Sequence, residues 1–165
     1  MDFNKSKYIE LLFYILSKSY DKPNIGKTVL CTLLYFIDFG YYERYGKLLT
    51  EETYKLSKKG IKPQHFNEVT DELIKNKQLF LRKEPYYNRT LHKYYPLIIP
   101  INRLTPKETE IADMSLNKLI DNNASSITTY IKNDPPVHIA ELGDELDFKY
   151  VFSRNNEYSM RKITE

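Results

Sequence analysis

The chain opens with apolar residues at intervals of three and four, the spacing of an amphipathic helix. These positions are Tyr8, Leu11, Leu12 and Ile15, with charged residues on the opposite side. Asp21, Lys22 and Pro23 interrupt the pattern, because proline cannot continue a helix. We therefore predict a helix within residues 1–23 that packs one face against a core.

The segment from Asn24 to Gly46 is the most apolar part of the chain. Its apolar positions leave little room for a polar face; they are Val29, Leu30, Leu33, Leu34, Phe36 and Ile37. A helix that is apolar on all sides is covered by other elements, so this one is predicted to form the centre of the core. Asp38 interrupts the apolar surface, and we place it at a solvent-facing edge, with an ion pair or a cap as the alternative. Gly46 suits the left-handed residue that ends a helix.

The middle of the chain alternates between extended and helical patterns. Residues 48–63 are polar and are punctuated by Gly60 and Pro63, which predicts a weak strand or an extended segment. Residues 64–76 predict a helix, because their apolar side chains share one helical face. These side chains are Phe66, Val69 and Leu73.

Two runs of alternating apolar residues follow, at 79–84 and 90–100. The segment between them, PYYNR, is rich in turn-forming residues. The pattern predicts a two-stranded hairpin with a longer turn over residues 85–89.

A helix start is clear at Thr105, which can cap the helix while Pro106 occupies the first position and Glu108 completes a capping box. The apolar side of this helix is formed by Ile111, Met114, Leu116 and Leu119. A shorter helix over 125–131 and a last strand over 147–152 are predicted before a polar tail. The elements together predict an α+β fold, a mainly helical single domain with a small antiparallel β-sheet.

Length and composition agree with one domain, since 165 residues of 41% apolar composition can bury one core. No apolar run approaches the ~20 residues of a membrane span, and no leader pattern precedes the first helix. We expect a cytoplasmic protein. The single cysteine, Cys31, lies in the apolar segment and is expected to be a buried, inert thiol.

Charge is divided unevenly along the chain. Residues 1–103 carry 18 Lys and Arg against 11 acids, whereas residues 104–165 carry 7 against 11. Such asymmetry is typical of a nucleic-acid face, of halves that attract each other, or of a charged protein partner. The modest net charge of +3 favours the two protein-contact interpretations.

No pattern in the sequence indicates catalysis. Gly26-Lys27-Thr28 lacks the upstream glycine of a phosphate-binding loop, and no serine stands in a GxSxG motif. The three histidines are His65, His92 and His138, and none has a metal-ligand spacing. We expect no catalytic residue, no metal and no cofactor.

A metal site is one interpretation of the cluster of carboxylates around His138. Its members are Asp134, Glu141, Asp144, Glu145 and Asp147. Pro135, Pro136 and Gly143 interrupt a helix there, and the order of acids in a calcium loop is absent. Caps, turns and solvated side chains are the favoured interpretation.

The predicted hairpin interleaves basic and tyrosine side chains, which is the composition of a nucleic-acid stacking surface. A helix-turn-helix is disfavoured, because residues 46–63 separate the second and third helices while that motif needs a turn of ~3–4 residues. A small nucleic-acid-binding transcriptional regulator is therefore the alternative function.

Four segments stand in an order that resembles the Panacea domain, also called the SocA-like antitoxin domain. They are residues 27–66, 104–113, 127–148 and 150–160. The resemblance covers residues 24–160, which leaves 1–23 as an N-terminal helix and 161–165 as a tail. The positions that carry the motifs are Gly46, Gly60, Pro63, Asp134, Pro136, Gly143 and Asp147.

The chain departs from the family pattern at two places. Pro63 is displaced from the Gly-Pro-Val-like turn of the family. Ile131 and Lys132 occupy the places of a Ser-His pair, and Val137 replaces a tryptophan. If that segment contacts a partner in other members, its use differs in this chain.

The Panacea domain is found in antitoxins and phage-associated proteins, so the resemblance implies a non-enzymatic role. Such a protein neutralises a toxin encoded by an adjacent gene by direct binding, or delivers its partner to a protease as an adaptor. Interfaces depend on a few aromatic and arginine anchors. The candidate anchors are Tyr41, Tyr42, Arg44, Tyr86, Tyr87 and Arg89, with a core edge or a solvated turn as the alternative for each.

Overall fold

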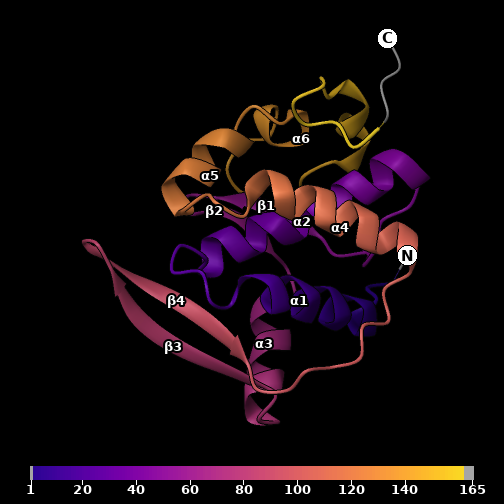
Figure 1. Cartoon of the computed structure of the whole chain (residues 1–165). Coiled ribbons are helices and arrows are strands. Elements are labelled where there is room, and N and C mark those ends of the chain that lie inside the picture. The colour runs from indigo at the N-terminus through magenta and orange to yellow at the C-terminus, as the bar shows by residue number, and fades with distance from the viewer. Residues whose placement is uncertain (1, 162–165) are drawn as a thin grey trace.

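The most apolar helix of the sequence lies at the centre of the fold, as predicted. In the computed structural model, which describes residues 2–161, α2 (Lys27–Tyr45) packs against α1 (Lys5–Ser19) and α4 (Pro106–Leu119) (Figure 1). Every residue from 29 to 41 is buried. The core is therefore built around α2 rather than between two layers of equal size.

The helix ends follow the predicted capping chemistry. The Thr105 side chain accepts a hydrogen bond from the Glu108 backbone, and the Glu108 side chain accepts one from the Thr105 backbone. Gly46 has φ of 77° and donates its N–H to the Tyr42 carbonyl at 2.8 Å, which ends α2. Asn4 caps α1 through the Lys7 N–H.

The strands form two separate two-stranded sheets rather than one. The first pairs β1 (Tyr54–Ser57) with β2 (Gly60–Pro63), and the second pairs β3 (Leu79–Tyr86) with β4 (Arg89–Pro96). Along the chain, α3 (Phe66–Lys75) separates the two sheets. The α+β class is confirmed, with helices dominating.

The β3–β4 hairpin extends away from the helices (Figure 1). The prediction of a long turn was wrong, because the strands pair as far as Tyr86 and Arg89 and leave only two residues in the turn. The second strand ends at Pro96 and not at residue 100. The predicted strand residues 97–100 lie outside the sheet, because β4 pairs with β3 only as far as Pro96.

The C-terminal part contains short helices: α5 (Ala124–Ile131), α6 (Pro135–His138) and the 3₁₀ helix η1 (Phe148–Ser153). The prediction of a strand at 147–152 was wrong. Asp147 accepts a hydrogen bond from the Lys149 N–H and starts η1. Phe148 and Val151 then face the core three residues apart, which is the period of a 3₁₀ turn and not of a strand.

The first helix belongs to the same core as the rest of the chain. Residues of α1 such as Tyr8, Leu11 and Ile15 are completely buried. The predicted tail begins at Arg161, and residues 162–165 lie outside the described part. Among residues 2–161, no helix combines the length and the apolar character needed to cross a membrane.

Candidate protein-binding surface

A buried ion pair joins the start of α6 to the residue that follows η1. Arg154 donates from Nε to Oδ1 of Asp134 and from Nη2 to Oδ2, each at 2.7 Å. Tyr35 donates its hydroxyl to Asp134 Oδ2 at 2.6 Å, and the Arg154 guanidinium lies over the Phe36 ring. Bidentate geometry of this kind gives strong, directional hydrogen bonds.

Glu43, near the end of α2, is a second anion for the same arginine. Its Oε1 accepts from Arg154 Nη1 at 3.1 Å and from the Met160 N–H at 2.8 Å. Its Oε2 accepts from Ser159 Oγ at 2.5 Å and from Arg161 Nε at 2.8 Å. The carboxylate therefore fixes the C-terminal segment against α2.

Burial lowers the pKa of Arg154, but hydrogen bonding and the charge of Asp134 outweigh it, and the net pKa is raised. Burial and the neighbouring Asp134 carboxylate also raise the pKa of Tyr35 far above its ordinary value. Arg154 remains a cation between two carboxylates, and Tyr35 remains a neutral donor. We call these residues the buried network: Tyr35, Glu43, Asp134 and Arg154.

Sequence reasoning found only Asp134 of the buried network, through the family pattern. A signal for Glu43 was available, because an acid in a helix predicted to be covered on most sides needs a buried cation. No spacing in the sequence connects Glu43 to Arg154, which lies 111 positions away. The partner could be found only once the fold brought both segments together.

Asp38 was placed at a solvent-facing edge, and that prediction was wrong. The side chain is completely buried. It accepts hydrogen bonds from the Thr50 N–H at 2.8 Å, from the Thr50 hydroxyl at 2.5 Å and from the Tyr54 hydroxyl. Burial raises the pKa of Asp38 to about 6 although these hydrogen bonds lower it. Asp38 thus connects α2 to the start of β1.

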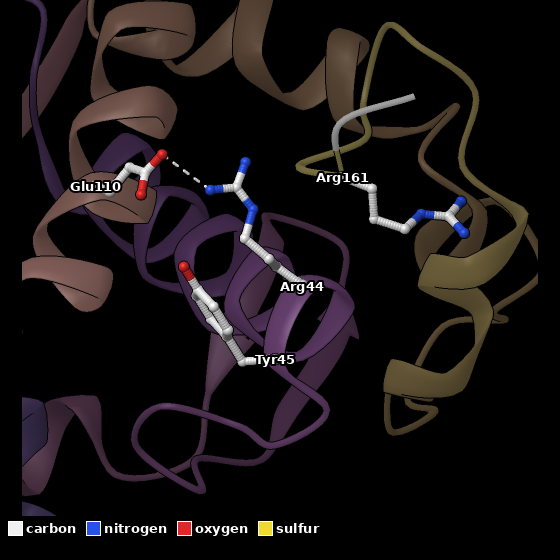
Figure 2. A pocket seen from close by; sticks show the side chains of 4 residues that line it. All are labelled: Arg44, Tyr45, Glu110 and Arg161. Atoms are coloured by element: carbon white, nitrogen blue, oxygen red, sulfur yellow. Dashed lines mark hydrogen bonds and ion pairs between the residues drawn. The ribbon is translucent and has the colours of Figure 1, made fainter. Parts of the chain in front are cut away.

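A concave site of about 390 Å³ opens beside the buried network. It is lined by Arg44, Tyr45, Glu110 and Arg161 (Figure 2). Arg44 Nη1 donates to Glu110 at 3.0 Å, and Arg44 Nε donates to the Met160 carbonyl at 2.9 Å. The Arg161 side chain points away from Arg44 (Figure 2). We call this the α2-end site.

A second hollow of about 550 Å³ adjoins the α2-end site, since Glu110 lines both. It runs along α4 and includes Leu104 and Met114. Arg161, which also lines the α2-end site, has its guanidinium carbon 5.9 Å from the centroid of the half-exposed Phe152 ring. The Tyr42 ring centroid lies 5.7 Å from that of Phe152. The α2-end site is therefore part of a larger surface with mixed apolar and charged character.

The structure places the three predicted anchors of α2 differently. Tyr41 is buried and packs against Tyr45, with ring centroids 4.8 Å apart. Tyr42 is half-buried beside Phe152, and Arg44 lines the α2-end site. Of the three, Arg44 and Tyr42 are partly exposed and Tyr41 is not.

The other three predicted anchors lie at the hairpin tip, far from the α2-end site. Tyr87 is 89% exposed and Arg89 is exposed, while Tyr86 is half-buried and its ring meets Tyr87 edge-on. Tyr87 has φ of 54°, a left-handed conformation that is rare for a bulky residue. The structure does not bring the two groups of anchors together (Figure 1).

The motif positions of the resemblance are mainly turn and cap residues. Gly46, Gly60 and Gly143 have φ of 77°, 108° and 92°. Pro63 ends β2 opposite Tyr54, and Asp147 starts η1. Two further positions are buried, Asp134 in the network and Pro136 in α6.

The described residues offer little for catalysis or metal binding. No group of three or more ligating side chains occurs within residues 2–161. His65 Nδ1 lies 2.7 Å from Glu52 Oε1, and the His138 side chain is exposed. Burial raises the pKa of the Cys31 thiol to about 12.

Comparison with known proteins adds no assignment: neither a family model, nor a curated protein, nor a solved structure matches the chain.

Proposed function

We propose that this protein is a cytoplasmic antitoxin that neutralises the toxin encoded beside it by direct protein–protein binding. The resemblance to the Panacea domain supports this role, and so does a surface built around a positioned arginine. The α2-end site receives a carboxylate or carbonyl group of the toxin, and the Tyr42 and Phe152 rings contact its apolar surface.

The observation that carries the proposal is the arrangement of Arg44. Three of its five N–H groups are directed at the Met160 carbonyl, Glu110 and the Met114 sulfur. The guanidinium is thereby fixed at the wall of the concave site. A side chain that is already ordered loses less entropy on binding, and arginine is among the commonest anchors of interfaces.

The site fits a protein partner better than a small molecule. Pockets for small ligands are mostly apolar and enclose their ligand. The α2-end site is instead an open hollow with three charged residues among its four lining residues. An open, charged hollow near the partly exposed Tyr42 and Phe152 rings is suited to a protruding side chain of another protein.

Co-expression with the neighbouring gene product tests the proposal. We expect the wild-type chain to restore growth and to co-purify with the toxin, and Arg44→Gln to do so much less well. The exposed Arg82→Gln on the hairpin is the control and keeps both properties. Unchanged toxicity together with no co-purifying complex overturns the proposal.

Delivery to a protease is a variant of the same binding function. Masking leaves the toxin intact in the complex, whereas an adaptor shortens its lifetime. The half-life of the toxin in cells with and without this protein separates the two.

Nucleic-acid binding is the second candidate, favoured by the hairpin. Arg82, Lys83 and Arg89 are exposed there, and the Tyr87 ring stands free at the tip. Binding to phosphates weakens steeply with salt. A mobility-shift titration tests this: a shift at low salt that disappears at high salt supports it, and no shift at low salt removes it.

A further inference from the structure

Five consecutive apolar residues are exposed in the segment between β4 and α4. Leu97, Ile98, Ile99, Pro100 and Ile101 are all exposed, and Ile99 reaches 98%. Phe80, the second residue of β3, is also half-exposed. A run of this length is normally covered in a folded protein unless it binds something. We call these residues the isoleucine strip: Phe80, Leu97, Ile98, Ile99 and Ile101.

The surroundings of the strip are basic. The Leu97 N–H donates to the Gln78 carbonyl at 2.9 Å, so residues 75–83 lie beside the start of the strip. That stretch contains four cations and no acid, and Arg103 follows the strip. The cations are Lys75, Lys77, Arg82 and Lys83. All five basic side chains are exposed, and none forms an ion pair with a described residue.

A surface of the opposite character lies in residues 138–150. Ile139, Leu142 and Tyr150 are exposed there, with Leu142 at 60%. Four exposed carboxylates surround them and have no ion-pair partner among the described residues: Glu141, Asp144, Glu145 and Asp147. We call residues 138–150 the acidic face.

The acidic face is held in one geometry by β1. Gly143 donates its N–H to the Leu56 carbonyl at 2.7 Å, and Leu56 donates to the Asp144 carbonyl at 3.0 Å. Leu146 donates to the Tyr54 carbonyl at 2.8 Å. A loop that is already ordered loses little entropy when it binds.

We propose that the isoleucine strip of one copy docks on the acidic face of a second copy. The two apolar surfaces bury each other, and the basic and acidic surroundings attract. Pairing of two strips about a two-fold axis is disfavoured, since it would bring like charges together. Within one chain the two surfaces lie apart, because the segment between β4 and α4 runs along the lower edge of the molecule, whereas α6 and β1, which flank and hold the acidic face, lie in its upper half (Figure 1).

This contact is heterologous, with different surfaces from the two copies. Each added copy leaves one strip and one acidic face free, so the assembly grows or closes into a ring. Two single-surface variants make the geometry testable. Ile99→Asp places a charge in the strip but keeps the acidic face, whereas Leu142→Lys does the reverse.

The experiment is size-exclusion chromatography with light scattering at low salt over a range of concentrations. For the wild type we expect a mass that rises above 19.7 kDa with concentration and falls back in high salt. Each variant alone stays at 19.7 kDa, and their equimolar mixture forms a dimer that grows no further. Tyr87→Asp is the control, because it places a charge at an exposed position outside both surfaces. This variant should associate like the wild type.

Three results would overturn the proposal. One is a wild-type protein that stays monomeric throughout, including one that instead binds vesicles of phosphatidylglycerol through the strip. Another is loss of association in Ile99→Asp but not in Leu142→Lys, which indicates two-fold strip pairing. The third is a mixture of the two variants that remains monomeric.

Discussion

Arg154 donates hydrogen bonds to both carboxylate oxygens of Asp134 at 2.7 Å, and neither side chain is exposed. Replacing the arginine by methionine leaves Asp134 as a buried anion without a cation and leaves Glu43 with Arg161 as its one cation among the described residues. Loss of one partner from a buried ion pair costs about 3–5 kcal/mol. We expect Arg154→Met to lower the free energy of unfolding in urea by an amount of this order. The exposed Arg103→Met should change it little, and a similar small effect of both variants would contradict the account.

Asp38 makes the stability depend on pH in an unusual direction. Burial raises its pKa to about 6, so the folded state binds the proton more tightly than the unfolded chain does. The contribution of Asp38 to the free energy of unfolding is therefore highest at low pH, and it falls as the pH rises from about 4 to about 6.

Asp38→Asn keeps the shape of the side chain and does not titrate. The difference in unfolding free energy, wild type minus variant, should fall by about 3 kcal/mol between about pH 4 and pH 7, since one pKa unit corresponds to about 1.4 kcal/mol. Urea titrations of both proteins at several pH values measure it. A difference that stays constant with pH would show that the pKa of Asp38 is not raised.

Thr105 caps α4 through the Glu108 backbone N–H. Thr105→Ala removes this acceptor and should lower the free energy of unfolding by about 1 kcal/mol. Thr105→Ser keeps the hydroxyl and should restore most of the loss. Thermal melts of the three proteins compare them, and equal melting temperatures for all would contradict a role for the cap.

Tyr87 stands at the hairpin tip with φ of 54° and 89% exposure. Glycine adopts this conformation without steric cost, so Tyr87→Gly should leave the stability unchanged or raise it by up to about 1 kcal/mol. If the ring is used for binding, the same variant weakens that binding. Chemical unfolding measures the first effect, and a clear loss of stability would show that the Tyr87 side chain supports the fold.

Local patterns in the sequence predicted most of the helices. The α4 cap and the Gly46 stop depend on residues within one or two turns, and both are present in the structure. The apolar run of α2 likewise predicted the core centre. The 3₁₀ helix at Phe148–Ser153 was missed, because short apolar runs fit a strand and a tight helix equally well.

The candidate site was less predictable, since it depends on residues that are distant in the sequence. Arg44 was named, but its partners Glu110 and Met160 come from α4 and the C-terminal segment. Asp38 was predicted at the surface because no local pattern in the sequence indicates that Thr50 and Tyr54 donate hydrogen bonds to it. Tertiary contacts decided both cases, and periodicity carries no information about them.

The affinity of the purified protein for the product of the neighbouring gene tests the central claim most directly. Isothermal titration calorimetry should give one toxin bound per chain, and Arg44→Gln should weaken the binding about tenfold or more, a loss of at least about 1.4 kcal/mol. The Arg82→Gln control should bind like the wild type, and melting temperatures should confirm that both variants are folded. No heat of binding from the wild-type protein, or equal affinities for Arg44→Gln and the wild type, would contradict binding through the α2-end site.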